Sequence, residues 1–181
     1  MKRKKKAAKE PVKYKLDIGC GKNKKEGFLG VDAIKMDGVD VVTDVRKTPW
    51  QWPDNSVSEV NCSHFLEHLD GPERVAFYNE LYRVMEPGAK ASIVVPHWGS
   101  GRAYGDPTHK FPPVVEMSFY YLSKEWRDAN APHCGLDCDF GVTWGHSLAQ
   151  PWNLKTPEQQ AFGVNHYREV AQDIVATLEK K

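Results

Sequence analysis

The sequence has little that is typical of membrane or secreted proteins. No apolar run in its 181 residues approaches the roughly 18–20 residues that a membrane-spanning helix needs. The N-terminus begins MKRKKKAAKE, and no apolar stretch follows it as in a secretory signal. The four cysteines, Cys20, Cys62, Cys134 and Cys138, are therefore expected to be reduced. We expect a cytoplasmic protein with no membrane partner.

The cysteines also lack the pairing that zinc sites usually show. His133, Cys134 and Cys138 form a single cluster, HCGLDC. Structural zinc sites more often contain Cys-x2-Cys twice, or one such pair together with two histidines. We therefore predict no metal centre.

The net charge is only +1, but the charges are unevenly distributed. Residues 1–15 carry eight Lys or Arg and one Glu, a net charge of +7, whereas the remaining 17 basic and 23 acidic residues give −6. We predict a basic, disordered N-terminal arm, residues 1–13, attached to a single domain, residues 14–181. The arm either is a solvated tail or binds an anionic partner such as nucleic acid.

Apolar runs alternate with turn signals through the first half of the chain. This order predicts a doubly wound, mostly parallel α/β sheet of the Rossmann-like kind, with ligands bound beyond the carboxyl ends of the strands. Strands are predicted at residues 14–18, 27–32, 39–45, 56–64 and 90–96, and a helix at 71–86.

The second half is less regular. A long loop rich in Gly and Pro covers residues 99–113, and loops of that length are often functional. Residues 114–129 and 157–170 are predicted to be helical, and residues 138–148 to form a strand. Residues 173–180 fit either state, and we favour a closing strand.

The first strand is followed by Gly19-Cys20-Gly21, but the third glycine of a dinucleotide-binding turn is missing. Only nine residues separate Ile18 from Phe28, whereas crossovers between parallel strands usually need a dozen or more. The first crossover is therefore predicted to be shortened, without its helix. A pyrophosphate would lose its usual helix N-terminus, which favours a cofactor without phosphates.

Two acids follow the next strands. Asp32 ends the second predicted strand, where a carboxylate can accept hydrogen bonds from both hydroxyls of a ribose, or cap a loop. Asp44 ends the third, where it either accepts from an adenine amino group or starts a turn.

The segments LDIGCG, TDV, PDNSVSEVNCSHFLEHL and LYRVMEPGAKASIVVP, in this order, resemble class I S-adenosylmethionine-dependent methyltransferases, especially the type-11 branch. The resemblance covers roughly residues 15–98. It implies S-adenosyl-L-methionine as cofactor and methyl transfer as activity. The lysine-rich loop after Gly21, Lys22–Lys25, departs from the family pattern.

The resemblance also assigns cofactor contacts by position. The methionine part would lie against Gly19, Cys20 and Gly21, and Asp17 would help to hold its amino group. Asp32 would bind the ribose, and Asp44 and Val45 would flank the adenine. Cys62, Ser63 and His64 would lie near the sulfonium.

A general base assists methyl transfer to a hydroxyl or a protonated amine, and histidine suits this role near neutral pH. The candidates are His64, His97 and His109, with Asp106 placed to orient His109. The histidines could instead be structural or bind a metal. In FLEHL, Glu67 and His68 either cap the segment or take part in the chemistry. The aromatic residues of this region would either form an apolar wall for the acceptor or anchor loop 99–113; they are Trp98, Tyr104 and Phe111.

The absence of two known motifs bears on the chemical class of the methyl acceptor. The segment after the fourth strand reads NCSHF, without the Asp/Asn-Pro-Pro-aromatic motif of base-amine methyltransferases or the Pro-Cys of cytosine C5 enzymes. These absences count against methylation of bases, but not against other positions of nucleic acids. The leading hypothesis is methyl transfer to an oxygen or nitrogen of a small molecule, glycan or peptide, by a monomer or homodimer. The rivals are a nicotinamide-dependent oxidoreductase and a non-catalytic or nucleic-acid-directed protein that binds the cofactor.

Overall fold

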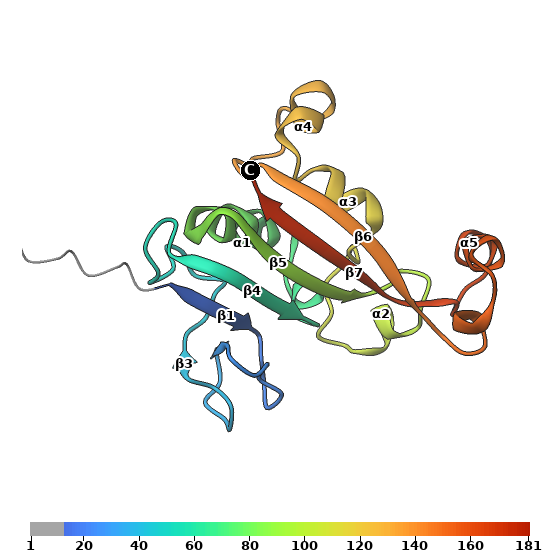
Figure 1. The fold of residues 1–181 in the computed structure, drawn as a ribbon, viewed down its shortest axis with the longest axis horizontal. Coiled ribbons are helices and arrows are strands. Elements are labelled where there is room, and N and C mark those ends of the chain that lie inside the picture. The colour runs from blue at the N-terminus through green and yellow to red at the C-terminus, as the bar shows by residue number, and fades with distance from the viewer. Residues whose placement is uncertain (1–12) are drawn as a thin grey trace, which may run out of the picture.

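A computed structural model describes residues 13–181, which form a seven-stranded sheet with the order β3-β2-β1-β4-β5-β7-β6 (Figure 1). The basic arm predicted for residues 1–13 lies outside the described residues except for Lys13. The strands are β1 Tyr14–Ile18, β2 Leu29–Asp32, β3 Val41–Val42, β4 Val57–Ser63, β5 Met85–Pro96, β6 Phe140–Leu148 and β7 Ala171–Lys180.

The order of the strands confirms the predicted Rossmann-like sheet. The first five strands pair in parallel, and β7 pairs antiparallel with both β5 and β6. The order reverses between β1 and β4, because the chain first moves outward to β2 and β3 and then returns. This switch point is where sheets of this kind bind ligands.

The shortened first crossover is confirmed, because turns alone connect β1 to β2. The crossovers from β2 to β3 and from β3 to β4 also lack helices, which the sequence pattern did not predict. Helix α1, Gly71–Val84, fills the next crossover and begins with a capping box between Asp70 and Glu73. It ends two residues earlier than predicted, since Met85 is fully buried and already pairs with Val57 in the sheet.

The predicted helix over residues 114–129 is wrong as a single element. The chain forms α3, Glu116–Tyr120, and α4, Lys124–Asn130. Between them Leu122 is buried, and its carbonyl accepts a hydrogen bond from Phe140 N–H, while Ser123 caps α4. Tertiary packing and this local cap therefore interrupt the helical pattern.

The C-terminal elements follow the prediction more closely. The strand over residues 138–148 and the closing strand over 173–180 are confirmed as β6 and β7. Helix α5, Pro157–His166, is shorter than predicted and packs on the short 3-10 helix η2, Trp152–Leu154. These elements project beyond the body of the domain at the ends of β6 and β7 (Figure 1). Loop 99–113 contains one short helix, α2, Arg102–Gly105.

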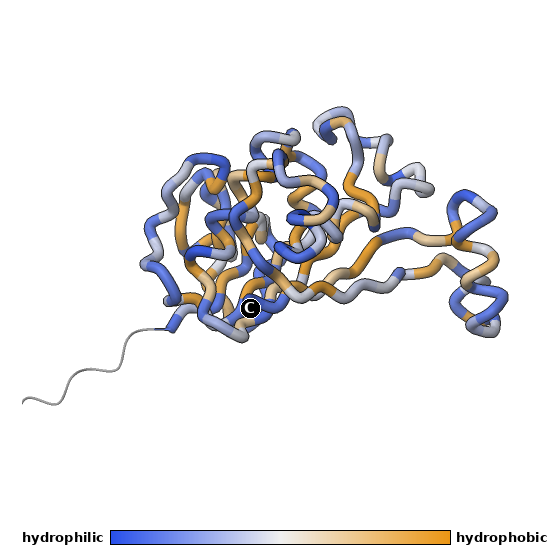
Figure 2. The backbone as a smooth tube through the Cα atoms, turned by 90° about the horizontal axis from the view of Figure 1, so that it is seen from above, coloured by the Kyte–Doolittle hydropathy of each residue, from blue (hydrophilic) through white to orange (hydrophobic). Residues whose placement is uncertain are grey.

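The two faces of the sheet differ in chemistry. The face that packs against α1 and α3 carries the apolar core, visible in Figure 2 as the hydrophobic strand segments beneath the helices. On the other face, Lys15, Glu59, Lys90 and Glu179 form one row across four neighbouring strands. The Lys15–Glu59 and Lys90–Glu179 ion pairs measure 2.8 and 3.5 Å.

Parallel sheets are usually covered by helices on both faces. Figure 1 looks onto the polar face, and no helix of residues 13–181 runs across it. Charged pairs in place of apolar side chains account for a parallel sheet that leaves one face open. Within the same residues, no helix is long and apolar enough to span a bilayer.

An ion-pair network ties the helix-free crossover before β4 to α1. Glu80 accepts hydrogen bonds from Trp50 N–H at 2.6 Å and from Arg83 Nη2 at 2.8 Å. Arg83 also donates to the carbonyls of Trp50 and Trp52. Both rings are buried, and the Trp50 ring packs between those of Trp52 and Phe77. The hydrogen bonds from Arg83 lower the pKa of Glu80.

Glu80→Gln is expected to lower the free energy of unfolding at neutral pH by about 1.5–3 kcal/mol, the usual range for hydrogen bonds to a charged group. Because the folded pKa is depressed, this stabilisation is present above the unfolded pKa and is lost as the pH falls through the folded one. Urea unfolding of both proteins between neutral pH and about pH 3 measures it, with Glu179→Gln in the exposed Lys90 pair as control. A difference that stays constant with pH would contradict this assignment.

Candidate active site

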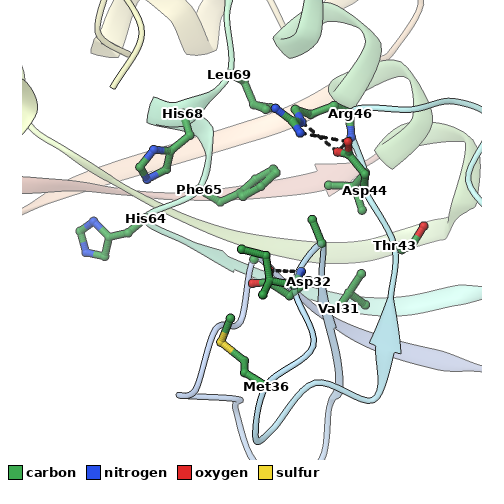
Figure 3. A pocket seen from close by; sticks show the side chains of 14 residues that line it. Val31, Asp32, Met36, Thr43, Asp44, Arg46, His64, Phe65, His68 and Leu69 are labelled. Atoms are coloured by element: carbon green, nitrogen blue, oxygen red, sulfur yellow. Dashed lines mark hydrogen bonds and ion pairs between the residues drawn. The ribbon is translucent and has the colours of Figure 1, made fainter. Parts of the chain in front are cut away.

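A cavity of about 430 Å³ opens beyond the carboxyl ends of β1 to β4. Each of the four strands contributes the residues that follow it, and the first four loops therefore converge on one space. Figure 3 shows Asp32 and Asp44 on one side of Phe65, and His64 and His68 on the other. The lining residues are Gly19, Val31–Ile34, Met36, Thr43–Arg46, His64, Phe65, His68 and Leu69.

Gly19 shapes the floor of this cavity. Its φ is +68°, and its N–H donates to the Val31 carbonyl at 2.8 Å. A Cβ at this position would lie 2.7 Å from the Phe65 ring. Glycine is therefore required both for the backbone conformation and for the close approach of Phe65.

Asp32 is held in place with acceptor capacity to spare. One carboxylate oxygen accepts from Gly21 N–H at 3.1 Å, and the other accepts from Ile34 N–H at 3.0 Å. Each oxygen of an ionised carboxylate has a second lone pair. Two neighbouring hydroxyls, such as those of a ribose, can therefore still bind to Asp32.

Asp17, Cys20 and Gly21 support the cavity without lining it. Asp17 is 3% exposed and accepts from Lys25 N–H and Asn61 Nδ2, each at 2.7 Å, which fixes the loop after Gly21 to the sheet. Gly21 contributes through its bond to Asp32. The Cys20 thiol is turned to the Gly21 carbonyl, and burial raises its pKa.

Two of the three lysines after Gly21, Lys24 and Lys25, have structural partners. Lys24 forms an ion pair with Asp40 at 2.9 Å, and the same carboxylate accepts from Gly30 N–H at 2.8 Å. Lys25 Nζ lies 4.4 Å from the centre of the Phe28 ring. The short loop that replaces the first crossover helix is thus anchored by its own side chains.

Asp44 lines the cavity and forms an ion pair with Arg46. Its carboxylate accepts from Arg46 N–H, Nε and Nη2 at 3.1, 2.8 and 3.0 Å, and the bonds from this side chain lower its pKa. This geometry supports the turn-forming role that the sequence left open for Asp44. Val45 lines the cavity next to it, and Arg46 is a lining residue that the sequence analysis missed. Contact of Val45 with an adenine stays a prediction.

Of the three residues predicted near the sulfonium, only His64 reaches the cavity. Cys62 is fully buried in the core, where desolvation raises the pKa of its thiol well above the usual value. Ser63 is half-buried and does not line the cavity. Cys62 and Ser63 belong to β4 and point to its two faces, whereas His64 follows the strand and faces the space beyond its end.

His64 adopts a φ of +54°, which is uncommon outside glycine and turns the ring out of the strand direction. Its Nδ1 lies 3.3 Å from Glu67 Oε1, and its Nε2 lies 3.9 Å from Asp173 Oδ1. Because the carboxylate accepts, Nδ1 carries the proton and Nε2 keeps its lone pair. The hydrogen bond to Glu67 raises the pKa of His64.

The prediction of His97 as a base does not match its surroundings. His97 is 3% exposed, and its Nδ1 accepts from Gly99 N–H at 3.0 Å. Its Nε2 therefore carries the proton and donates to Glu116 at 3.0 Å. With both nitrogens engaged, the ring has no lone pair for a substrate. Glu116, which also contacts His146 at 2.8 Å, is the partner that the sequence pattern did not reveal.

Loop 99–113 lies next to the short 3-10 helix η1, Leu66–His68, as the backbone bond from Lys110 N–H to the Glu67 carbonyl at 2.7 Å shows. His109 in this loop packs against the His68 ring, with 4.8 Å between the ring centres. Asp106 does not orient His109, because it accepts from Thr108 and lies 3.9 Å from His109 Nε2. The Ala103 carbonyl accepts from His109 Nδ1 instead, at 3.1 Å.

The remaining candidates lie outside the cavity lining. Trp98, Tyr104 and Phe111 expose between 45% and 86% of their surface. In the HCGLDC cluster, His133 is exposed, whereas Cys138 is fully buried, and desolvation raises the pKa of its thiol to about 12.

Residues 22–93 match the sequence model of a family described as "Methyltransferase domain". No curated protein matches the chain. Among solved structures, an S-adenosylmethionine-dependent methyltransferase from Archaeoglobus fulgidus superposes with a TM-score of 0.67 at 22% identity, over 93% of this chain and 86% of the other. One from Methanosarcina mazei gives 0.57 at 16% identity, over 94% and 93%.

The two comparisons support different statements. The structural likeness, at these identities, establishes the fold, whereas the family match covers residues 22–93, which is less than half of the 181 residues. Strand order, shortened crossover and the cavity at the switch point agree with both. The chain therefore has the fold of S-adenosylmethionine-dependent methyltransferases, and part of it, residues 22–93, resembles the methyltransferase-domain family.

Proposed function

We propose that this protein is an S-adenosylmethionine-dependent methyltransferase, which transfers the methyl group of its cofactor to an oxygen or nitrogen atom of a small molecule, a glycan or a peptide, at the His64 end of the cavity. The observation that carries the proposal is that two different polar groups line the two parts of one continuous cavity. One part offers the spare acceptor capacity of Asp32, and the other offers an imidazole that is 39% exposed.

The residues present fit the cofactor. The cavity volume lies in the range of small-molecule sites, and its apolar walls include Val31, Met36 and Phe65. Asp32 would hold the ribose hydroxyls, and the missing phosphate cradle matches a cofactor without phosphates. When bound, S-adenosylmethionine supplies a methyl group on a sulfonium, so that the acceptor forms a bond to carbon while the carbon–sulfur bond breaks.

His64 is placed to take the proton that the acceptor loses. Glu67 holds the Nδ1–H, which fixes the tautomer and leaves Nε2 as the proton acceptor. The backbone N–H of His64 donates to the Val94 carbonyl at 2.8 Å and anchors the residue to β5. The hydrogen bond to Glu67 therefore orients the ring, and the backbone bond fixes the residue. His64 would accelerate the reaction chiefly by being held in position.

The other expectations stay predictions. These are the acceptor class, a monomeric or homodimeric state, a cytoplasmic location and an anionic partner for the basic arm. The alternative of a non-catalytic or nucleic-acid-directed protein depends on residues 1–13, which lie outside the described residues apart from Lys13.

A transfer assay over acceptor classes tests the proposal. The full-length protein is incubated with S-adenosylmethionine labelled in its methyl group and with pools of alcohols, phenols, amines, glycans and peptides. We expect label on oxygen or nitrogen, with S-adenosylhomocysteine formed in equal amount. Transfer only to carbon or sulfur, or tight binding of NADH without binding of S-adenosylmethionine, would overturn it.

A further inference from the structure

Glu67 has an unmet electrostatic requirement. Its side chain is only 6% exposed. Its Oε1 faces His64, whereas its Oε2 has no hydrogen-bond partner among the described residues. The Arg74 guanidinium lies nearby, where its Nε and Nη1 donate to the Leu66 and Pro112 carbonyls and its buried Nη2 has no hydrogen-bond partner among the described residues. Its charge acts on Glu67, but no ion pair within 4.0 Å joins the two side chains. A buried carboxylate oxygen without a partner is costly, unless a cation occupies the adjacent space.

The His68 ring presents a free lone pair. Thr108 Oγ1 donates to Asp106 Oδ1 at 2.7 Å, because the carboxylate can only accept. The same hydroxyl oxygen therefore accepts from His68 Nδ1, 3.0 Å away. Nδ1 carries the proton, and Nε2 is left as an unprotonated donor of a lone pair.

His109 has the same tautomer for an independent reason. Its Nδ1 lies 3.1 Å from the Ala103 carbonyl, which accepts only, so that Nδ1 carries the proton. The Nε2 of His109 has no hydrogen bond within the described chain, and Asp106 Oδ2 is 3.9 Å away. Histidine ligands of metals typically donate their other N–H to a carbonyl, a carboxylate or a similar partner, as both rings do here.

We propose that Glu67, His68 and His109 bind a divalent first-row transition-metal ion, such as Zn²⁺, beside the cofactor cavity. One ligand atom from each residue lies within 4.8 Å of the other two. Bonds of about 2.0–2.2 Å to zinc would draw these atoms together by roughly an ångström, which side-chain rotation supplies. Two imidazoles and one carboxylate are a known donor set for catalytic zinc and iron, with coordination positions left open.

A second cluster also contains two histidines and one glutamate, but its hydrogen bonds leave no lone pair on His97 for a metal ion. His97, Glu116 and His146 also bring ligand atoms within 4.8 Å. However, the bond from Gly99 N–H forces the proton of His97 onto Nε2, which donates to Glu116. This cluster satisfies its own carboxylate through hydrogen bonds, and His97 has no lone pair for an ion. It provides the matched control.

The ion would lie at the acceptor end, because His68 lines the cavity and Glu67 contacts His64. This consequence rests on the proposed function, whereas the metal site does not. An ion there would lower the pKa of an acceptor hydroxyl that binds to it and would fix the position of that hydroxyl.

Metal binding without cofactor or acceptor tests the site. The full-length, untagged protein is treated with chelator, desalted, and titrated with Zn²⁺ by calorimetry, and with Co²⁺ by visible absorption. We expect one ion per chain. His68→Gln and His109→Gln are expected to lose more than the roughly 10–100-fold in affinity that removal of a supporting residue costs. Thr108→Val, which removes the support of His68, should lose about 10–100-fold, and His146→Gln should keep the affinity.

The outcomes separate this proposal from the function. Circular dichroism checks that each variant is folded, and Thr108→Val keeps the test valid if a histidine variant is not. No binding of either ion by the wild-type protein would overturn the site, as would equal affinities in the His68, His109 and His146 variants. Methyl transfer by the chelated protein is measured separately and bears on the proposed function alone.

Discussion

Asp32→Asn is expected to weaken S-adenosylmethionine binding by roughly ten- to 150-fold, which corresponds to the 1.5–3 kcal/mol typical of hydrogen bonds to a charged group. The carboxylate is held by Gly21 N–H and Ile34 N–H and would accept both ribose hydroxyls. An amide of the same size keeps the shape but offers one acceptor oxygen and a donor in place of the other. Isothermal calorimetry with S-adenosylmethionine and S-adenosylhomocysteine measures the loss.

Asp40→Asn is the matched control for this variant. Asp40 also accepts a backbone hydrogen bond, from Gly30, and pairs with Lys24, but it does not line the cavity. Its substitution should leave cofactor affinity within a few-fold of the wild type. Wild-type affinity in Asp32→Asn, or an equal loss in Asp40→Asn, would remove the ribose assignment.

His64→Asn is expected to lower kcat by about 100- to 10,000-fold, the usual contribution of a general base, with little change in cofactor affinity. Asparagine is chosen because it tolerates the positive φ of this position better than most residues and can still hydrogen-bond to Glu67. The change therefore removes the imidazole without straining the backbone. Steady-state kinetics with the identified acceptor, together with calorimetry for the cofactor, separate the two effects.

His166→Asn serves as the control for His64. His166 ends α5, is exposed, and donates only to the Phe162 carbonyl, so that turnover should be unchanged. A loss of cofactor affinity in His64→Asn as large as its loss of turnover would place His64 at the cofactor end. Unchanged turnover would exclude it as the base.

The strands could be predicted because apolar runs and turn residues mark them locally. The first two crossovers, residues 19–28 and 33–40, are both too short for a helical connection, although only the first was predicted to lack its helix. The third, residues 43–56, is long enough to hold a helix, so its length gave no warning. The split between α3 and α4 depends on the burial of Leu122 and its bond to Phe140, which belongs to tertiary structure. A helical apolar pattern alone does not contain that contact.

The same distinction applies to the site. Gly19 and Asp32 could be placed because strand ends meet at one edge of a parallel sheet. Which histidine can act as a base could not be predicted, because the backbone N–H of Gly99 alone decides whether His97 has a free lone pair. Glu116 was missed because His97 and His146 become its neighbours only when the chain folds. Arg46 lies two residues from its partner Asp44, so the sequence did contain the signal for that pair.

The position of S-adenosylhomocysteine in a crystal structure of the full-length protein tests the central claim most directly. We predict the adenosyl group in the cavity beyond β1 to β4, both ribose hydroxyls on Asp32, and the amino-acid part directed toward His64. Density for the ligand elsewhere on the protein, with this cavity free of it, would contradict the account.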